Sequence, residues 1–118
     1  SLNQSLEEAI KSHANNEIIL IMHADLPRIN EFDLQILANS YSSKKVSIVS
    51  DLHKQGTNCL MFNASINFQL KFGLDSYNLF QHEFKYNDIN YQDINIESLQ
   101  DDLDSEEDYF KLIKYIKS

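Results

Sequence analysis

The stretch IILIMHADLP, residues 18–27, joins a run of five apolar residues to an aspartate and to the only proline of the chain. A short apolar run without polar alternation is typical of a strand buried on both faces, as in a parallel sheet. Pro27 fixes the turn after this strand and biases Leu26 toward an extended conformation. Because ligands of open α/β sheets bind beyond the carboxyl ends of strands, Asp25 is a candidate for holding Mg²⁺ against a phosphate. The alternative is a turn aspartate before a helix, with no ligand.

Helical and extended patterns alternate on both sides of this stretch, which predicts an α/β fold. The helices are expected over residues 4–13, after a cap at Asn30, over 75–84, and over 109–116 after a capping-box pattern at Ser105 and Asp108. The strands are expected over residues 17–22, 46–49, 59–62 and 89–96, with a short extended piece over 99–103.

Composition restricts the classes of function. The 118 residues suffice for one compact domain, and the net charge of −8 argues against a nucleic-acid partner. No apolar stretch approaches the roughly 20 residues of a membrane span, and the start has no signal-peptide pattern, so we expect a cytoplasmic protein. The single cysteine, Cys59, excludes an internal disulfide, and its spacing from His13, His23 and His82 does not suit a zinc site.

A glycine turn, DLHKQGTN at residues 51–58, lies between two predicted strands. Gly56 permits close approach of the backbone, Thr57 adds a hydroxyl group and Asn58 adds an amide. Successive backbone N–H groups in such a loop can form an anion-binding nest. A hairpin turn that contains a glycine is the alternative.

A second glycine turn, FGLDS at residues 72–76, precedes a predicted helix. Gly73 again allows close approach, and Ser76 lies at the expected helix start, where free N–H groups and the helix dipole favour anions. The alternative is that Asp75 or Ser76 caps the helix and no ligand binds.

An acidic segment, DDLDSEED at residues 101–108, completes the set. Asp102 and Asp104 alternate along an extended piece, so both side chains can point to one side. Helix capping is again the alternative, although it does not explain the acids that precede Ser105.

HADLP, DLHKQGTN, FGLDS and DDLDSEED, in this order, resemble the 2-phospho-L-lactate or phosphoenolpyruvate guanylyltransferase family of deazaflavin coenzyme (F-420) biosynthesis. The resemblance begins at Ser1-Leu2-Asn3, which is similar to a Gly-Leu-Asn element of the family, and covers almost the whole chain. It implies a Rossmann-like nucleotidyltransferase sheet with flanking helices. It also implies transfer of GMP from GTP to the phosphate of 2-phospho-L-lactate, phosphoenolpyruvate or 3-phosphoglycerate, with release of pyrophosphate.

The resemblance implies roles for three acids. Asp25 and Asp102 correspond to the catalytic metal ligands of the family, and Asp104 lies beside them as a further ligand for Mg²⁺. Two aspartates from separate strand ends can hold this ion between attacking and leaving oxygens.

Other positions correspond to substrate contacts. Thr57, Gly73 and Ser76 would hold the carboxylate and phosphate of the acceptor acid, and we also expect Asn58 to bind substrate. Asn3 would lie near the nucleotide.

The sequence differs from the family pattern at several places, and two alternative functions are compatible with it. The family has an N-terminal strand and a basic loop ahead of Gly-Leu-Asn, so we expect residues 1–118 to form a single, incomplete domain that could pair as a homodimer through an exposed sheet edge. Gln55 replaces a small residue, and Ser105-Glu106 replace Thr-Pro. The alternatives are a nucleotidyltransferase of the molybdopterin guanylyltransferase type, which FGLDS disfavours, and a non-catalytic α/β binding module.

Overall fold

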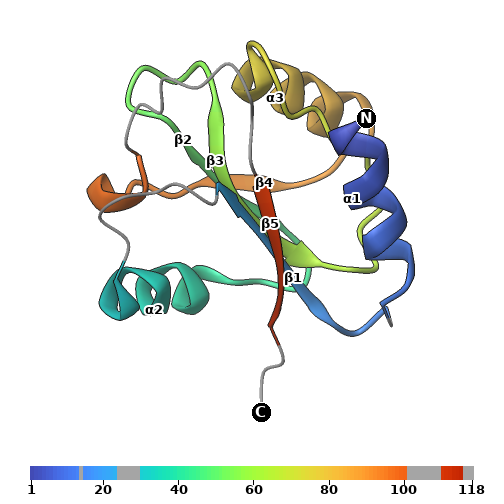
Figure 1. Cartoon of the computed structure of the whole chain (residues 1–118), viewed down its shortest axis with the longest axis horizontal. Coiled ribbons are helices and arrows are strands. Elements are labelled where there is room, and N and C mark those ends of the chain that lie inside the picture. The colour runs from blue at the N-terminus through green and yellow to red at the C-terminus, as the bar shows by residue number, and fades with distance from the viewer. Residues whose placement is uncertain (14, 24–29, 101–109, 116–118) are drawn as a thin grey trace.

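The computed structural model describes residues 1–13, 15–23, 30–100 and 110–115, and for residues 110–115 it describes the backbone alone. Nine elements follow one another along these residues: α1 (Leu2–Lys11), β1 (Ile18–His23), α2 (Glu31–Ser40), β2 (Val46–Ser50), β3 (Thr57–Asn63), α3 (Ser76–Tyr86), β4 (Tyr91–Asp93), the 3₁₀ helix η1 (Glu97–Leu99) and β5 (Phe110–Tyr115). The strands form one sheet in the order β4-β2-β3-β1-β5 (Figure 1).

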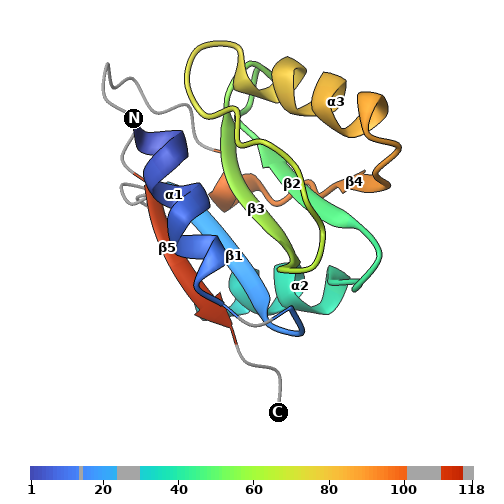
Figure 2. The same cartoon turned by 90° about the vertical axis from the view of Figure 1, so that its right-hand side faces the viewer.

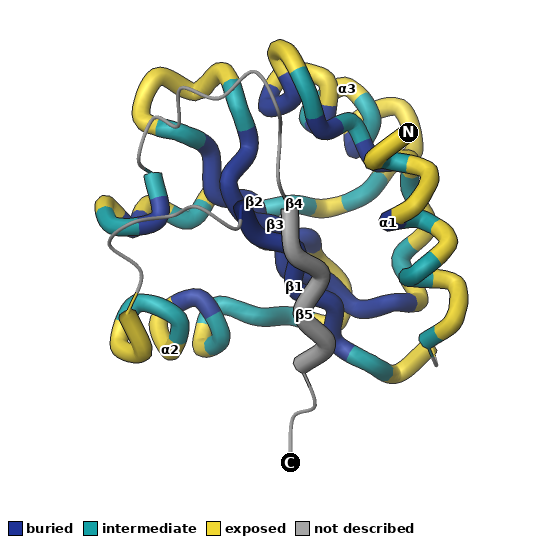
Figure 3. The backbone as a smooth tube through the Cα atoms, in the orientation of Figure 1, coloured by how far each residue is buried: buried dark blue, intermediate teal, exposed yellow. Residues whose placement is uncertain are grey.

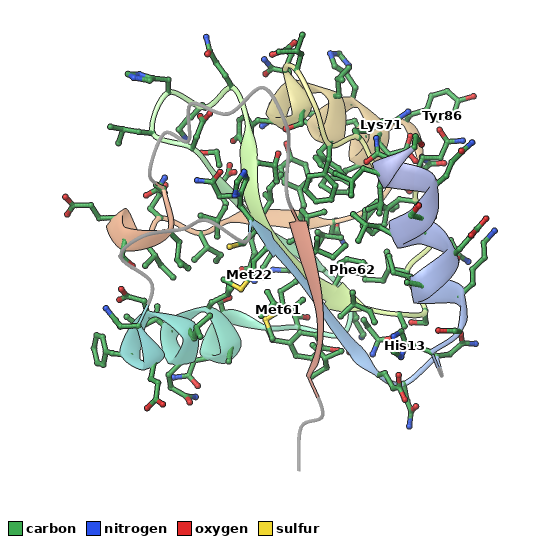
Figure 4. The ribbon with its side chains drawn as sticks, in the orientation of Figure 1. His13, Met22, Met61, Phe62, Lys71 and Tyr86 are labelled. Carbon is green, nitrogen blue, oxygen red and sulfur yellow. The ribbon has the colours of Figure 1, made fainter. Side chains whose placement is uncertain are left out.

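Helices cover both faces of this sheet, which confirms the α/β prediction. α1 and α3 pack on one face, and α2 with η1 packs on the other (Figures 1 and 2). β1, β2 and β3 are buried along their length, whereas β4 is only partly buried (Figure 3). Met22 and Met61 lie on the side of α2, whereas Phe62 lies on the side of α1 (Figure 4).

β1 is buried on both faces as predicted, because all six of its residues are buried. The expected parallel pairing is wrong, since β1 runs antiparallel to both β3 and β5. An apolar run reports burial on two faces, and in this chain helices supply that burial without a parallel neighbour. The parallel pair of the sheet is β2 with β4.

The predicted C-terminal helix is also wrong. Phe110–Tyr115 is strand β5, and it pairs with β1 from Ile18↔Tyr115 to His23↔Phe110. Aromatic and β-branched residues suit a strand, and pairing with the free edge of β1 outweighs the helical spacing of the apolar positions. The capping-box residues Ser105 and Asp108 lie outside the described residues.

The other expected elements differ mainly in their bounds. Asn30 caps α2 as predicted, with its side-chain oxygen accepting from the Asp33 N–H at 2.8 Å. The strand expected over residues 89–96 shortens to β4, and η1 replaces the start of the extended piece at 99. Among the helices of the described chain, none has the length and apolar character to cross a bilayer.

Candidate active site at the end of the central strands

The turn between β2 and β3 is built around one carboxylate. Asp51 accepts hydrogen bonds from the N–H of Gln55 at 2.9 Å and of Gly56 at 2.8 Å. A Cβ atom on Gly56 would lie 2.9 Å from the Asp51 Oδ2 atom, so a larger residue there would require the Asp51 carboxylate to shift. The predicted anion nest is therefore wrong for these two amides, and the hairpin alternative holds.

A β-bulge at the start of β3 separates two side chains that the sequence places together. Val49 pairs with Cys59 but Ser50 pairs with Thr57, which leaves Asn58 as the extra residue. A bulge reverses the alternation of faces along a strand. As a result Thr57 faces α3, while Asn58 donates its amide N–H to the Leu99 carbonyl of η1 at 3.0 Å.

Thr57 and Ser76, both predicted to bind the acceptor, come together across β3 and α3. Their hydroxyl oxygens lie 3.1 Å apart, and the two side chains are only 3% and 2% exposed. The Tyr77 N–H donates to the Gln55 carbonyl at 3.0 Å, which fixes the start of α3 against the turn. The family resemblance placed both hydroxyls in one site, and the structure shows that they are in contact. Their role toward a ligand remains a prediction.

The capping interpretation of FGLDS is wrong. Asp75 occupies the N-cap position in a left-handed conformation, with φ of 56°, and its side chain makes no cap hydrogen bond. Ser76 is the first helical residue, and its hydroxyl group is turned to Thr57. Gly73 has φ of 131°, and a Cβ built on it would meet no atom within 4 Å. Backbone conformation, and not close approach of a neighbour, therefore requires this glycine.

Asn3 lies at the other end of the same turn. Its amide group donates to the Phe72 carbonyl at 3.1 Å and accepts from the Phe72 N–H at 2.9 Å. The family resemblance placed Asn3 near a nucleotide, and the contact that the structure gives it is with the backbone of Phe72, beside Gly73.

The three predicted metal ligands, Asp25, Asp102 and Asp104, lie outside the described residues. The described 1–13, 15–23 and 30–100 contain no cluster of three or more His, Cys, Asp or Glu side chains that could hold a metal ion. The oxygen ligands of an Mg²⁺ site would therefore have to come largely from those acids.

The residues that flank these acids do converge. Met22 pairs with Cys59, so His23 and Asn58 each lie one residue beyond that pair on adjacent strands. His23 also pairs with Phe110, which follows the acidic segment, and Asn58 binds Leu99, which precedes it. The residues that flank both acid-bearing segments therefore lie at the same end of the adjacent strands β1 and β3.

A polar network that the sequence did not indicate links α3 to β4. The Tyr77 hydroxyl donates to Asp93 of β4 at 2.7 Å and accepts from the Gln81 amide at 3.2 Å, and the Lys54 ammonium lies 5.7 Å from the centre of the Tyr77 ring. Burial, reinforced by the bond to Asp93, raises the pKa of Tyr77, so it remains a neutral donor. Its position in an apolar helical stripe predicted only a core residue.

A large groove of the described surface lies elsewhere. It has a volume of about 570 Å³ and runs between α1, residues 67–69 and the end of α3, near Tyr86 (Figure 4). Its described lining includes none of the predicted site residues.

Comparison with models of known protein families shows to which family the chain belongs. A model described as "guanylyl transferase CofC like" matches residues 1–115. The chain belongs to this family. The resemblance drawn from the four motifs is thereby confirmed, and with it the general class of guanylyltransferase in coenzyme F-420 biosynthesis. A comparison with curated proteins gives no match.

Proposed function

We propose that this CofC-like chain carries the acceptor site and the metal site for transfer of GMP from GTP to the phosphate of a small three-carbon phospho-acid. The candidate acceptors are 2-phospho-L-lactate, phosphoenolpyruvate and 3-phosphoglycerate. The second product is pyrophosphate.

The observation that supports this proposal is the convergence of chain segments at one end of β1 and β3. Asp25 follows His23 by two residues and so lies within about 7 Å of it along the chain, and Asp102 lies within about 11 Å of Leu99. Because His23 and the Asn58 partner of Leu99 sit on adjacent strands, both acids are within reach of one ion. Thr57, whose hydroxyl group contacts that of Ser76, immediately precedes Asn58 at the same end of β3.

The reaction requires little proton transfer by protein side chains. An oxygen of the acceptor phosphate is already anionic, and it attacks the α-phosphorus of GTP while the bond from that phosphorus to the β-phosphate oxygen breaks. Catalysis of this kind depends on positioning and on stabilisation of charge. A bound Mg²⁺ supplies the charge neutralisation when Asp25, Asp102 and Asp104 hold it.

The described residues supply the positioning. A hydroxyl group has one donor and two acceptor sites, so two hydroxyls that share one hydrogen bond keep one O–H for a third oxygen. Thr57 and Ser76 therefore retain a donor for the carboxylate or phosphate of the acceptor. Because both residues are nearly buried, neighbouring groups must move before the acceptor can contact their hydroxyls.

The test uses GTP, Mg²⁺ and each of the three phospho-acids, with pyrophosphate release as the readout. Asp25→Asn should lower the rate by several orders of magnitude if this carboxylate holds the ion. Asp88→Asn is the matched control, because Asp88 is exposed at the far end of α3 and the change in charge is the same. Release of pyrophosphate with none of the three acids, or equal rates for the two variants, would refute the proposal. Calorimetry with Mg²⁺ and phosphoenolpyruvate then separates the two remaining cases, because a chain that carries the acceptor site should show heat of binding and a non-catalytic interaction module should show none.

A further inference from the structure

The turn that precedes α3 is held at its two ends and not along its length. Gly73 has open space around its Cβ position, Leu74 is 95% exposed, and Asp75 adopts a left-handed conformation without a side-chain cap. Packing of Gly73 and Leu74 therefore does not fix the turn, and the Asp75 side chain is held from the helix side, where the Asn78 amide donates to it at 2.7 Å. Its conformation depends on what holds Phe72 before it and Ser76 after it.

The end at Ser76 is held from the sheet. The Ser76 hydroxyl contacts Thr57 of β3, and the next residue, Tyr77, donates its N–H to the Gln55 carbonyl. Tyr77 is further tied to Asp93 through its hydroxyl group.

The end at Phe72 is held from α1, by a residue 69 positions away in sequence. Asn3 uses one carbonyl oxygen and one amide nitrogen to pair with both polar groups of the Phe72 backbone, in the manner of a short strand pair. The Phe72 ring packs edge-on against Phe80 of α3, with ring centres 5.1 Å apart. The ring fixes the depth of Phe72, while the two hydrogen bonds fix the direction in which its peptide enters the turn.

We propose that Asn3 is a positioning residue for the acceptor phospho-acid, acting through Phe72 on the turn from Gly73 to Ser76. This inference rests on the proposed function. It assigns Asn3 to the acceptor half of the reaction, whereas the family resemblance placed it near the nucleotide. The two assignments differ in which Michaelis constant should rise when Asn3 is replaced: that for the phospho-acid or that for GTP.

The kinetic test replaces Asn3 with leucine, which keeps the side-chain size and removes both hydrogen bonds. The KM for the phospho-acid should rise about tenfold, while the KM for GTP should stay within about twofold of the wild-type value. Gln4→Leu is the matched control, because Gln4 is exposed on the same helix one residue away. Asn3→Ala is the second variant, and it avoids overpacking if leucine is not accommodated.

A second measurement requires no substrate. Hydrogen exchange at the Phe72 amide should accelerate at least tenfold in both Asn3 variants, because Asn3 is the acceptor of that N–H. The Leu60 amide of β3 serves as the internal reference for global unfolding.

Each outcome decides the inference. Unchanged exchange at Phe72, or a rise of the GTP KM that equals or exceeds that of the phospho-acid, would overturn it. If the wild-type chain neither turns over nor binds any phospho-acid, the proposed function fails and the acceptor role of Asn3 fails with it. Exchange then reports separately whether Asn3 holds the turn.

Discussion

The hydroxyl oxygens of Thr57 and Ser76 lie 3.1 Å apart, between the first residue of β3 and the first residue of α3. The contact exists because the bulge at Asn58 turns Thr57 toward α3. With uninterrupted alternation Thr57 would share the face of Cys59 and Met61, on the side of α2. A one-residue irregularity of the backbone thus creates the candidate acceptor site.

Removing either hydroxyl should weaken acceptor binding more than it weakens the fold. We expect Thr57→Val and Ser76→Ala each to raise the KM of the phospho-acid about tenfold and to lower the free energy of unfolding by about 1 kcal/mol, since each leaves one buried hydroxyl without its partner. The double variant should lose less stability than the two single losses added together. Initial rates and urea unfolding measure these effects, with Ser43→Ala in the exposed turn before β2 as the control. Strict additivity would show that the hydroxyls do not act as a pair.

The cost of replacing Gly56 in the β2–β3 turn should depend on the side chain of Asp51. Gly56→Ala brings a methyl group to 2.9 Å from the Asp51 carboxylate, and we expect it to destabilise the chain by about 1–3 kcal/mol. In an Asp51→Ala background the same substitution should cost much less, because the obstructing atom is gone. Thermal unfolding of the four proteins measures the difference. An equal cost in both backgrounds would mean that Gly56 is required by its backbone conformation and not by Asp51.

The sequence predicted the elements whose signal is local. The buried run at Ile18–His23 and the cap at Asn30 rest on composition and on one side-chain hydrogen bond, and both were read correctly. Strand direction was missed, because burial on two faces says nothing about the direction of a neighbour. The C-terminal strand was missed because its partner residues in β1 lie 87 to 97 positions earlier in the chain.

The candidate site was predicted by the order of its motifs more than by its geometry. Thr57 and Ser76 were assigned together, and they do meet. The bulge that brings them together has no signature in a single sequence, and neither has the pairing of Asn3 with Phe72, since both depend on contacts between distant segments. The nest at Gly56 failed for a local reason, because an aspartate five residues before it can occupy the same N–H groups.

Cys59 gives a prediction about alkaline stability. Burial raises the pKa of its thiol from 9.0 to about 12, so the native state keeps the proton over a range in which the unfolded state loses it. The unfolded state therefore binds fewer protons above pH 9, and stability should fall from about pH 9 to about pH 12, with no contribution of this kind below pH 9. Cys59→Ala should flatten that part of the pH profile, although its stability at neutral pH will be lower. Urea unfolding across the range measures the slope, and at pH 8 the native thiol should react with maleimide only as fast as the chain unfolds.

The bond from Asn58 to Leu99 gives a test of the proposed metal site that does not alter a carboxylate. Asn58→Leu removes the donor from the Leu99 carbonyl and so loosens the residue that precedes Asp102 and Asp104. We expect the Mg²⁺ concentration for half-maximal rate to rise about tenfold, in addition to a loss of stability of about 1–3 kcal/mol. Asn63→Leu is the control, because Asn63 is similarly buried at the other end of β3 and donates its amide to the Tyr41 hydroxyl at 3.0 Å. It should destabilise the chain to a comparable extent and leave the Mg²⁺ dependence unchanged. If both variants shift the Mg²⁺ requirement equally, the effect is one of general stability, and Asn58 does not anchor the acidic segment for metal binding.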